Sequence, residues 1–292
     1  SNIIPFRKRN KHPMKFFLLL FTTTSSLQHA AYTIRIHPLP NRNDALSLLE
    51  QKLSLTSQYD YRSKLGWDSL KLDRRSSIPV NDPIMERSYG EFPPTSLDLV
   101  LDRAEELLDD GGGSDAGTAR TIPLTVTDLG SGCGRLCVYM ALSRPEYNVQ
   151  GIEIAEELHG EALESASRAV QGGYAHVSST PPSLSPMETT PVTNLSFYCG
   201  PAESKPAWLQ NSQIIFCYST VFESSHFDED IGAMVLSEYW NDVLTNHCQL
   251  GTVVITTERA LDPKRGWTLL DRMEVENREV FGSTAFLQRL DR

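Results

Sequence analysis

Basic side chains are scarce in this chain. Its 292 residues include 27 lysines and arginines against 37 aspartates and glutamates, which gives a formal net charge of −10. Unaided binding to nucleic acid depends on clustered basic side chains, so this balance argues against direct contact with DNA or RNA. Cysteine is also sparse, and no pair of the five cysteines has metal-binding spacing next to a histidine. We therefore expect reduced thiols and no metal site.

Long apolar runs are missing as well. The apolar stretch at residues 16–21 is too short to cross a bilayer as a helix, so we predict no membrane span. From Met14 onward the sequence has a lysine, this short apolar core and then small residues at its end. These features are typical of a targeting peptide for an organelle or the secretory route. A disordered tail with an accidental apolar patch explains the same residues. In both interpretations residues 1–40 are an extension outside the catalytic fold, and residues 41–292 form the catalytic domain.

Motifs for covalent catalysis are absent. The chain contains no G-x-S-x-G and no H-E-x-x-H, so neither a serine nucleophile nor a zinc-dependent hydrolase is indicated. This absence is compatible with a reaction in which a bound cofactor supplies the electrophile. In such a reaction the protein contributes orientation and the exclusion of water.

A strand, a glycine-rich turn and a helix form the centre of the chain. The apolar residues Leu124 and Val126 predict a buried strand that runs into the sequence G-S-G-C-G. Gly130, Gly132 and Gly134 allow positive φ values and a close approach of the backbone to a ligand. A helix is predicted to follow, ending before the proline at position 145.

Two classes of ligand bind at such corners, dinucleotides and S-adenosylmethionine. The dinucleotide fingerprint G-x-G-x-x-G needs a third glycine where this chain has Arg135. Asp128 lies inside the turn, where it would repel a pyrophosphate and attract the ammonium and sulfonium of S-adenosylmethionine. Glu153 ends the next predicted strand, residues 147–153, and is placed to accept hydrogen bonds from both ribose hydroxyls. The pattern therefore predicts the S-adenosylmethionine site of a class I methyltransferase.

Hydrophobic periodicity elsewhere predicts an α/β chain. Thr95 and Asp98 form a capping-box pattern at the start of one helix. Residues 171–193 are rich in glycine, serine, threonine and proline, and we interpret them as a disordered surface insertion. The expected architecture is a Rossmann-like class I methyltransferase fold with a central, mostly parallel seven-stranded sheet and a C-terminal antiparallel hairpin. The remaining predicted helices are 44–65, 155–170 and 228–247, the remaining parallel strands are 195–200, 214–218 and 251–257, and the hairpin pairs 267–276 with 283–290.

Ligands of an open α/β sheet lie beyond the carboxyl ends of its strands. Tyr218 and Ser219 leave the fourth parallel strand at that edge, which makes them candidates for a catalytic role. A polar strand exit explains them equally well. His159 and His226 are further candidate bases, although an isolated histidine is more often a surface or helix-end residue.

A resemblance to a known family adds to this interpretation. The sequences Tyr-Gly-Glu at 89–91 and T-S-L-D-L-V at 95–100 resemble the stretch before the cofactor site in the disruptor-of-telomeric-silencing family of histone lysine methyltransferases. The D-L-G-S-G-C-G and G-I-E segments are similar to that family's D-L-G-S-G-x-G and G-V-E. The resemblance covers roughly residues 85–290 and implies a protein lysine N-methyltransferase. Its implied cofactor residues, together with those above, are Tyr89, Glu91, Thr95, Asp128, Gly130, Ser131, Gly132, Gly134, Glu153 and Gly200.

Within this resemblance, Tyr89 and Glu91 are expected to fold over the methionine end of the cofactor. Glu91 would pair with its ammonium, and Thr95 or Ser96 would lie near its carboxylate. Phe222 matches the last phenylalanine of the family's N-N-F-A-F segment beside the lysine channel, and it joins Tyr218 and Ser219 as a catalytic candidate.

Two departures leave the methyl acceptor open. The family's G-D-F corresponds to G-P-A at 200–202, so the contact of its acid with the adenine amine is lost or moves to Glu203. Only the phenylalanine of N-N-F-A-F is kept in residues 218–222. Three hypotheses follow. The first is a protein lysine methyltransferase, which is expected in the nucleus if it is directed at histones. The second is a methyltransferase for a small molecule or a non-histone protein, and the third is a non-catalytic cofactor-binding module.

Overall fold

The computed structural model describes residues 32–51, 63, 90–110, 123–177, 193–277 and 282–292. They belong to one unit of the chain, Ala31–Arg292. None of the helices in these ranges is long and apolar enough to span a membrane.

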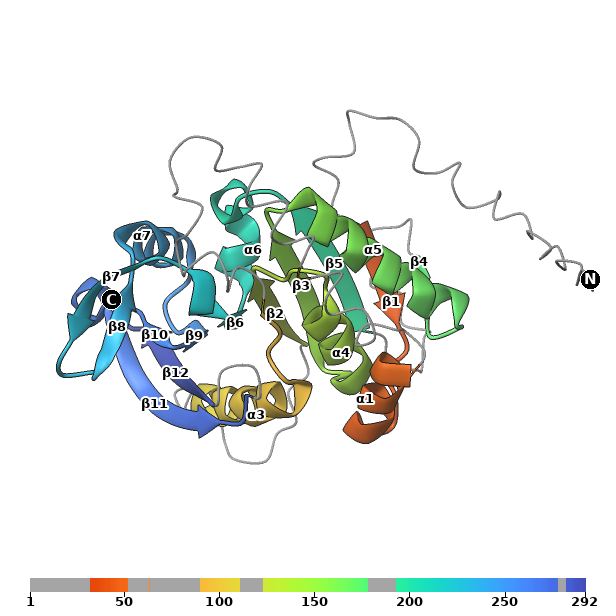
Figure 1. Ribbon diagram of the computed structural model, residues 1–292, viewed down its shortest axis with the longest axis horizontal. Coiled ribbons are helices and arrows are strands. Elements are labelled where there is room, and N and C mark those ends of the chain that lie inside the picture. The colour runs from red at the N-terminus through yellow and green to blue at the C-terminus, as the bar shows by residue number, and fades with distance from the viewer. Residues whose placement is uncertain (1–31, 52–62, 64–89, 111–122, 178–192, 278–281) are drawn as a thin grey trace, which may run out of the picture. The chain divides into compact units, whose positions relative to one another are not determined.

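Five parallel strands form the middle of a nine-stranded sheet (Figure 1). In spatial order they are β5 (Thr193–Cys199), β3 (Tyr147–Glu153), β2 (Leu124–Leu129), β6 (Ile214–Cys217) and β9 (Val253–Thr257). Beyond β9 the antiparallel strand β12 (Ser283–Leu290) pairs with β11 (Trp267–Val275). Beyond β5 the sheet continues with β1 (Tyr32–Ile36) and β4 (Ala175–Val177), each antiparallel to its inner neighbour. A separate sheet has the order β10 (Arg259–Ala260), β8 (Ala233–Leu236) and β7 (Ser224–Asp228).

The order and directions of these strands confirm the predicted Rossmann-like α/β fold with its C-terminal antiparallel hairpin. The number of strands was wrong. The described residues form nine strands in the main sheet rather than seven, because β1 and β4 extend its far edge.

Helices cover both faces of the sheet, as a buried parallel sheet requires. Strand β6 shows the alternation: Ile214 and Phe216 belong to one apolar cluster, and Ile215 and Cys217 belong to the other. The first cluster packs on α1 (Arg42–Gln51), α3 (Pro94–Asp110), α4 (Arg135–Ser143) and α5 (Glu156–Gln171). The second packs on α6 (Pro206–Asn211) and α7 (Glu238–His247). Short 3-10 turns occur at η4 (Ala202–Ser204), η5 (Ser219–Val221) and η6 (Pro263–Arg265).

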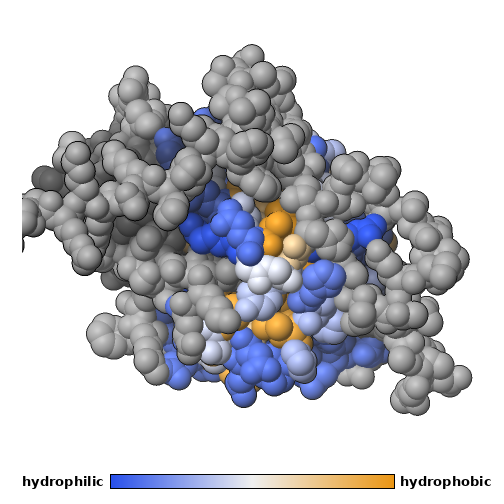
Figure 2. All heavy atoms as spheres, turned by 90° about the vertical axis from the view of Figure 1, so that its right-hand side faces the viewer, coloured by the Kyte–Doolittle hydropathy of each residue, from blue (hydrophilic) through white to orange (hydrophobic). Residues whose placement is uncertain are grey.

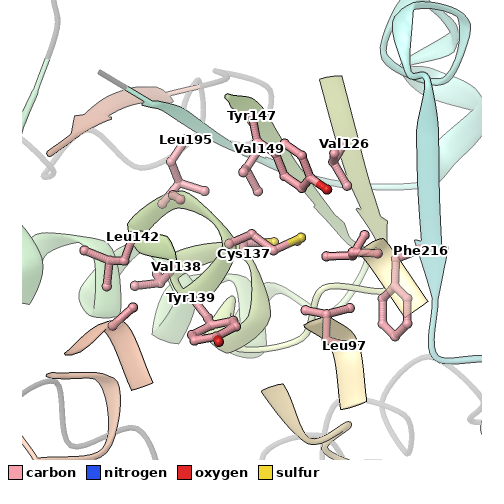
Figure 3. Close-up of a cluster of buried hydrophobic side chains, with 14 of the residues drawn as sticks. Leu97, Val126, Cys137, Val138, Tyr139, Leu142, Tyr147, Val149, Leu195 and Phe216 are labelled. Atoms are coloured by element: carbon pink, nitrogen blue, oxygen red, sulfur yellow. The ribbon is translucent and has the colours of Figure 1, made fainter. Parts of the chain in front are cut away.

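Figure 3 shows the centre of the first cluster, where Cys137 and Val138 of α4 lie among side chains of the neighbouring strands. Val126 and Val149 come from β2 and β3, and Leu97 comes from α3. All five side chains are almost completely buried. Burying a side chain of this size contributes about 1.5–3 kcal/mol, so this cluster holds the glycine corner in place between β2 and α4.

The predicted boundary at residue 40 is wrong for β1. Tyr32–Ile36 pairs with Thr193–Phe197 of β5, so this segment is part of the sheet. Ile34 and Ile36 are buried, while Thr33 and Arg35 are partly exposed. This alternation is the signature of a half-buried strand. The face of the molecule on the side of β1 and α1 carries mostly hydrophilic side chains around a narrower hydrophobic strip (Figure 2).

The proposed insertion at residues 171–193 is wrong at both ends. Ala175–Val177 forms β4 and pairs with Ile34–Ile36, and Thr193 begins β5. Residues 178–192 lie outside the described residues. Composition alone hid β4 because a strand of three residues is too short to show a period.

The predicted helix at 228–247 is half wrong. Its second half is α7, but its first half belongs to the hairpin of β7 and β8. Gly232 has a φ of 70°, which breaks a helix and permits the turn. In β8 the exposed Met234 lies between buried residues, a period of two.

Two helix starts also differ from prediction. Helix α3 begins at Pro94, so Thr95 lies in its first turn and is not the N-cap. Proline suits this first position because it has no N–H to leave unpaired. Helix α1 begins at Arg42 rather than 44, and the predicted continuation through 52–62 lies outside the described residues.

Candidate functional site

The turn between β2 and α4 is the centre of the candidate site. Gly130, Gly132 and Gly134 have φ values of 81°, 53° and 71°, which confirms the expected left-handed turn. The N–H groups of Gly130 and Ser131 both donate to the carbonyl oxygen of Ile152, each at 2.9 Å. These two hydrogen bonds hold the glycine loop against the carboxyl end of β3.

Glu153 is hydrogen-bonded to this loop through its carboxylate. Its Oε2 accepts the N–H of Gly132 at 2.7 Å, and its Oε1 accepts the N–H of Ala155 at 2.8 Å. Burial raises the pKa of the carboxyl, while these backbone hydrogen bonds act in the opposite direction. A carboxylate has about four lone-pair positions. The N–H groups of Gly132 and Ala155 orient Glu153, and the backbone of Ile154 contributes a further hydrogen bond, which leaves the carboxylate some capacity for a hydroxyl group of a ligand.

Asp128 is the second buried acid of the corner. It is only 3% exposed, and the thiol of Cys137 donates to its Oδ2 at 3.5 Å. Burial is the main cause that raises the pKa of Asp128 to about 7; the Cys137 hydrogen bond opposes this rise and the charge of Glu153 adds to it. Its observed partner is therefore a side chain of α4, and a direct role toward a cofactor stays a prediction.

Close packing explains why glycine is needed beside this loop. A Cβ added at Gly134 would lie 2.8 Å from Ala162 and from the ring of Phe197. At Gly151 it would lie 2.7 Å from the same ring. The hydroxyl of Ser131 is buried and has no hydrogen-bond partner among the described residues, which is costly unless a ligand or a water supplies one.

The segment before α3 reaches the start of α4. The Oε2 of Glu91 lies 3.6 Å from Nη1 of Arg135, and both side chains are largely buried. The predicted partner Tyr89 lies outside the described residues. Thr95 is exposed, and the hydroxyl of Ser96 donates to the carbonyl of Glu276 at 2.5 Å.

Gly200 lies at the same edge of the sheet as the glycine loop. Its N–H donates to the carbonyl oxygen of Glu153 at 2.9 Å, and its φ is 142°. This contact places the end of β5 beside the end of β3, as the sequence predicted. Glu203, the alternative acid for an adenine amine, accepts a hydrogen bond from Tyr239 at 2.8 Å.

Ser219 has a structural role in this fold, contrary to its prediction as a catalytic residue. It is completely buried, and its hydroxyl donates to the carbonyl of Thr257 at 2.6 Å. The same hydroxyl accepts the N–H of Thr257 at 3.1 Å. The hydroxyl of Ser219 thus both donates and accepts a hydrogen bond, and these two bonds connect η5 to β9.

Tyr218 and Phe222 flank Ser219 with different surroundings. The hydroxyl of Tyr218 accepts a hydrogen bond from Asn277 at 3.0 Å. Phe222 stacks on Trp240 with a centroid distance of 4.3 Å and an angle of 20°. A Cβ at Gly130 would lie 3.5 Å from the ring of Phe222, so the structure brings Phe222 against the glycine loop.

Sequence reasoning missed three residues of this region. Trp240 comes from α7 and supports Phe222. Arg259 donates from Nη1 to the carbonyls of Ser219 and Thr220, each at 2.7 Å, and thereby holds η5. Arg135 enters the sequence argument only as a missing glycine, and the structure places it at the first position of α4 with Glu91 beside it.

The two candidate histidines lie on different elements. His159 is on α5, where burial lowers its pKa, and its ring is 6.5 Å from that of Phe197. His226 is exposed on β7, with Nδ1 2.9 Å from the hydroxyl of Ser225. In the described part of the chain, no group of three or more histidine, cysteine or acidic side chains is arranged to hold a metal ion.

Comparisons with known proteins add little to this picture. No protein-family model and no curated protein sequence matches the chain. Among solved structures, the chain is similar to magnesium protoporphyrin IX methyltransferase from Synechocystis with bound SAM, at 15% identity over 80% of this chain and 96% of the other, with a TM-score of 0.38. A S-adenosylmethionine-dependent methyltransferase from Clostridium acetobutylicum matches at 12% identity over 70% and 94%, with a TM-score of 0.39. An arsenic(III) S-adenosylmethionine methyltransferase from Chlamydomonas reinhardtii matches at 15% identity over 69% and 75%, with a TM-score of 0.37. Similarities this weak assign no ligand or activity to this chain.

Proposed function

We propose that this protein is an S-adenosylmethionine-dependent methyltransferase and that its acceptor is a lysine side chain of a protein. The observation that carries the first part is the junction of the glycine loop with Glu153. Two backbone N–H groups orient the carboxylate of Glu153 at the end of a parallel strand, which is where ligands of open α/β sheets bind.

The residues present fit the cofactor. Glu153 retains acceptor capacity for a ribose hydroxyl, and the three left-handed glycines permit close approach of a ligand. The buried hydroxyl of Ser131 lacks a partner in the described residues. When bound, the cofactor supplies the electrophilic methyl group, and the protein's task is to orient the acceptor and exclude water.

An amine acceptor is supported by the charge at the same edge of the sheet. The segments that follow the parallel strands, including the first turn of α5 and the turn η4, carry several acids, which attract an ammonium group. Phe222, which stacks on Trp240, offers aromatic surface beside the glycine loop, and such surface suits the aliphatic stem and the charge of lysine. The acids are Glu156, Glu157, Glu203, Glu223 and Glu258.

A small-molecule or non-histone acceptor is the second candidate. It is favoured by the departures at residues 200–202 and 218–222, where the likeness to the histone-directed family is weakest. Labelled S-adenosylmethionine offered with nucleosomes, with a mixture of basic peptides and with metabolite extract distinguishes the candidates by mass spectrometry. Label on a lysine supports the proposal, and label only on a metabolite contradicts its second part.

Substitution of Glu153 tests the cofactor site. Glu153→Ala removes the acceptor for the ribose, and we expect S-adenosylmethionine to bind about 10- to 100-fold more weakly, as for the loss of a charge-assisted hydrogen bond. Isothermal titration calorimetry measures the change. Glu164→Ala, an exposed glutamate farther along the next helix, is the matched control and should bind normally. Unchanged affinity in Glu153→Ala would remove this residue from the site.

A further inference from the structure

Strand β7 is the outermost strand of the small sheet formed by β10, β8 and β7 (Figure 1). In the described part of the chain, its only strand partner is β8. The N–H and C=O groups along the outer edge of such a strand can pair with another extended chain. The first four residues of β7 are exposed, so a second chain can reach this edge.

Two apolar side chains are exposed on one face of this sheet. Phe227 of β7 is paired with Met234 of β8, and their exposed fractions are 57% and 37%. Directly paired residues point to the same face of a sheet. On the opposite face, Ala233 and Ala260 are buried in one apolar cluster with Phe286. The small sheet therefore has one packed face and one face that presents an apolar pair to solvent.

The exposed face continues to Phe222, where we place the methyl acceptor. Leu236 follows Met234 by two positions and thus lies on the same face of β8. It belongs to the apolar cluster against which Phe222 packs. Arg259, which is paired with Met234, donates to two carbonyls of η5. Strand β7 begins at Ser224, two positions after Phe222, so a chain that lies along β7 has one end near Phe222.

The charge of the hairpin favours a basic segment. Its turn carries Asp228, Glu229 and Asp230. The Oδ1 of Asp228 accepts the N–H groups of Asp230 and Ile231, each at 3.0 Å, and thereby shapes the turn. Glu229 and Asp230 are exposed and attract lysine and arginine side chains. A second copy of the protein would be repelled, because the exposed Glu223 precedes β7 and acids therefore stand at both ends of the strand.

We propose that the outer edge of β7 binds an extended basic segment of the acceptor protein as an added strand. The inference rests on the proposed function and names the surface that presents the target lysine. Main-chain hydrogen bonds to β7 hold the segment. Its apolar side chains and aliphatic stems pack on Phe227 and Met234, and its basic side chains pair with Glu229 and Asp230. The lysine nearest Phe222 is the one presented for methylation.

A labelled short peptide of alternating lysine and valine is the probe. Fluorescence anisotropy measures its affinity for the full chain without any need for turnover. Two comparison peptides test the mode of binding. The first has every backbone nitrogen methylated and offers no main-chain donor, and the second carries glutamate in place of lysine. We expect the probe to bind at least about 10-fold more tightly than either of them.

A matched pair of variants tests the apolar contact. Met234→Ser and Leu269→Ser each remove an apolar side chain, and the two side chains are almost equally exposed, at 37% and 36%. Leu269 lies on β11, which is the edge strand of the main sheet. Met234→Ser should weaken binding of the probe about 3- to 10-fold through lost apolar contact, and Leu269→Ser should leave it unchanged.

A second pair of variants tests the charges. Glu229→Gln combined with Asp230→Asn should weaken binding of the probe about 3- to 10-fold. Glu146→Gln combined with Glu164→Gln removes the same charge from two exposed sites on other elements and should have no effect. Thermal unfolding checks that every variant is folded.

The outcomes separate this inference from the proposed function. If the probe binds no more tightly than the comparison peptides, or if Met234→Ser and Leu269→Ser behave alike, the docking surface is wrong and the methyltransferase proposal stands. If light scattering shows a dimer that Phe227→Ser converts to a monomer, β7 binds a second copy and the inference is also wrong. If the probe binds at β7 but calorimetry detects no binding of S-adenosylmethionine, the proposed function is wrong, and with it the role of the segment as acceptor.

Discussion

Among the described residues, the glycine corner and the end of α4 each hold buried charged side chains, and at each place the neighbouring groups decide how well the charge is compensated. At the glycine corner, Asp128 and Glu153 are buried acids at neighbouring strand ends. Glu153 is compensated by backbone N–H groups, including those of Gly132 and Ala155, whereas the partner of Asp128 among the described residues is the thiol of Cys137. The ionised form of Asp128 is thus stabilised less by its neighbours than that of Glu153. This agrees with the raised pKa of Asp128, which is about 7.

The pKa of Asp128 predicts a pH dependence of stability. An unfolded chain ionises this carboxyl near 3.8, its ordinary value, while the folded protein holds the proton until about 7. The unfolded state therefore binds fewer protons between these values, and the free energy of unfolding falls as the pH rises from about 4 to about 7. The full loss is roughly 4 kcal/mol and levels off above the folded pKa. Asp128→Asn should lack this component, with urea unfolding at several pH values as the measurement.

The exposed Glu157→Gln variant is the control for Asp128→Asn and should follow the wild-type curve. A slope in Asp128→Asn equal to that of the wild type would show that Asp128 is ionised in the folded protein, and that burial costs it less than we infer.

Arg144 forms the second buried charge centre, at the end of α4. It is 1% exposed, and its guanidinium lies 3.0 Å from Asp98, 2.8 Å from Asp102 and 2.5 Å from Glu105. Removing one partner of a buried pair leaves uncompensated charge and costs about 3–5 kcal/mol. We expect Arg144→Met to lower the free energy of unfolding by this amount in a denaturant titration. A loss under about 1 kcal/mol, the size for a surface pair, would mean that water reaches these acids.

At the scale of elements, β1 changes the view of where the domain begins. It inserts between β5 and β4, so β4 has a partner in the sheet only through β1. Its buried residues Ile34 and Ile36 join the same apolar cluster as the strands of the parallel core. Residues before position 40 therefore contribute to the stability of the domain.

Ile36→Ala measures this contribution. The side chain is fully buried, and its truncation should lower the free energy of unfolding by about 2–5 kcal/mol through lost burial and a cavity. The same substitution at Ile154, which is 61% exposed, should cost far less. Thermal and urea unfolding of both variants provide the comparison. If both variants lost only a little free energy of unfolding, and by equal amounts, β1 would not unfold cooperatively with the rest of the domain.

At the scale of the whole molecule, the net charge of −10 and the acids at the carboxyl edge of the sheet act in the same direction. A negative field raises the encounter rate of a cationic acceptor and is screened by salt. If the acceptor is a basic polypeptide, kcat/KM should fall roughly 3- to 10-fold between about 20 mM and about 200 mM salt.

The affinity for S-adenosylmethionine serves as the internal reference for this salt series, because its polar groups bind inside the site and are screened less. A kcat/KM that does not change with salt would argue for a neutral acceptor and thus for the small-molecule alternative.

The sequence by itself determined the features that a few neighbouring residues encode. The apolar run of β2, the positive φ of Gly130 and Gly134, and an acid at the end of β3 follow from local backbone chemistry and from a period of two. The same local rules failed where the signal was short or ambiguous: at β4, and at β7 and β8 within an apparent helix.

Only the tertiary structure decided which partner each polar side chain takes. Ser219 is bound to Thr257, 38 positions away, and this contact turns a catalytic candidate into a structural residue. Likewise, the glycine pattern identified Arg135 only as a residue that breaks a fingerprint, and the fold placed Glu91 against it. The physical reason is that a hydroxyl or a guanidinium is satisfied by whichever group the packing of the sheet and helices brings within hydrogen-bond reach, and spacing along the chain does not encode that neighbour.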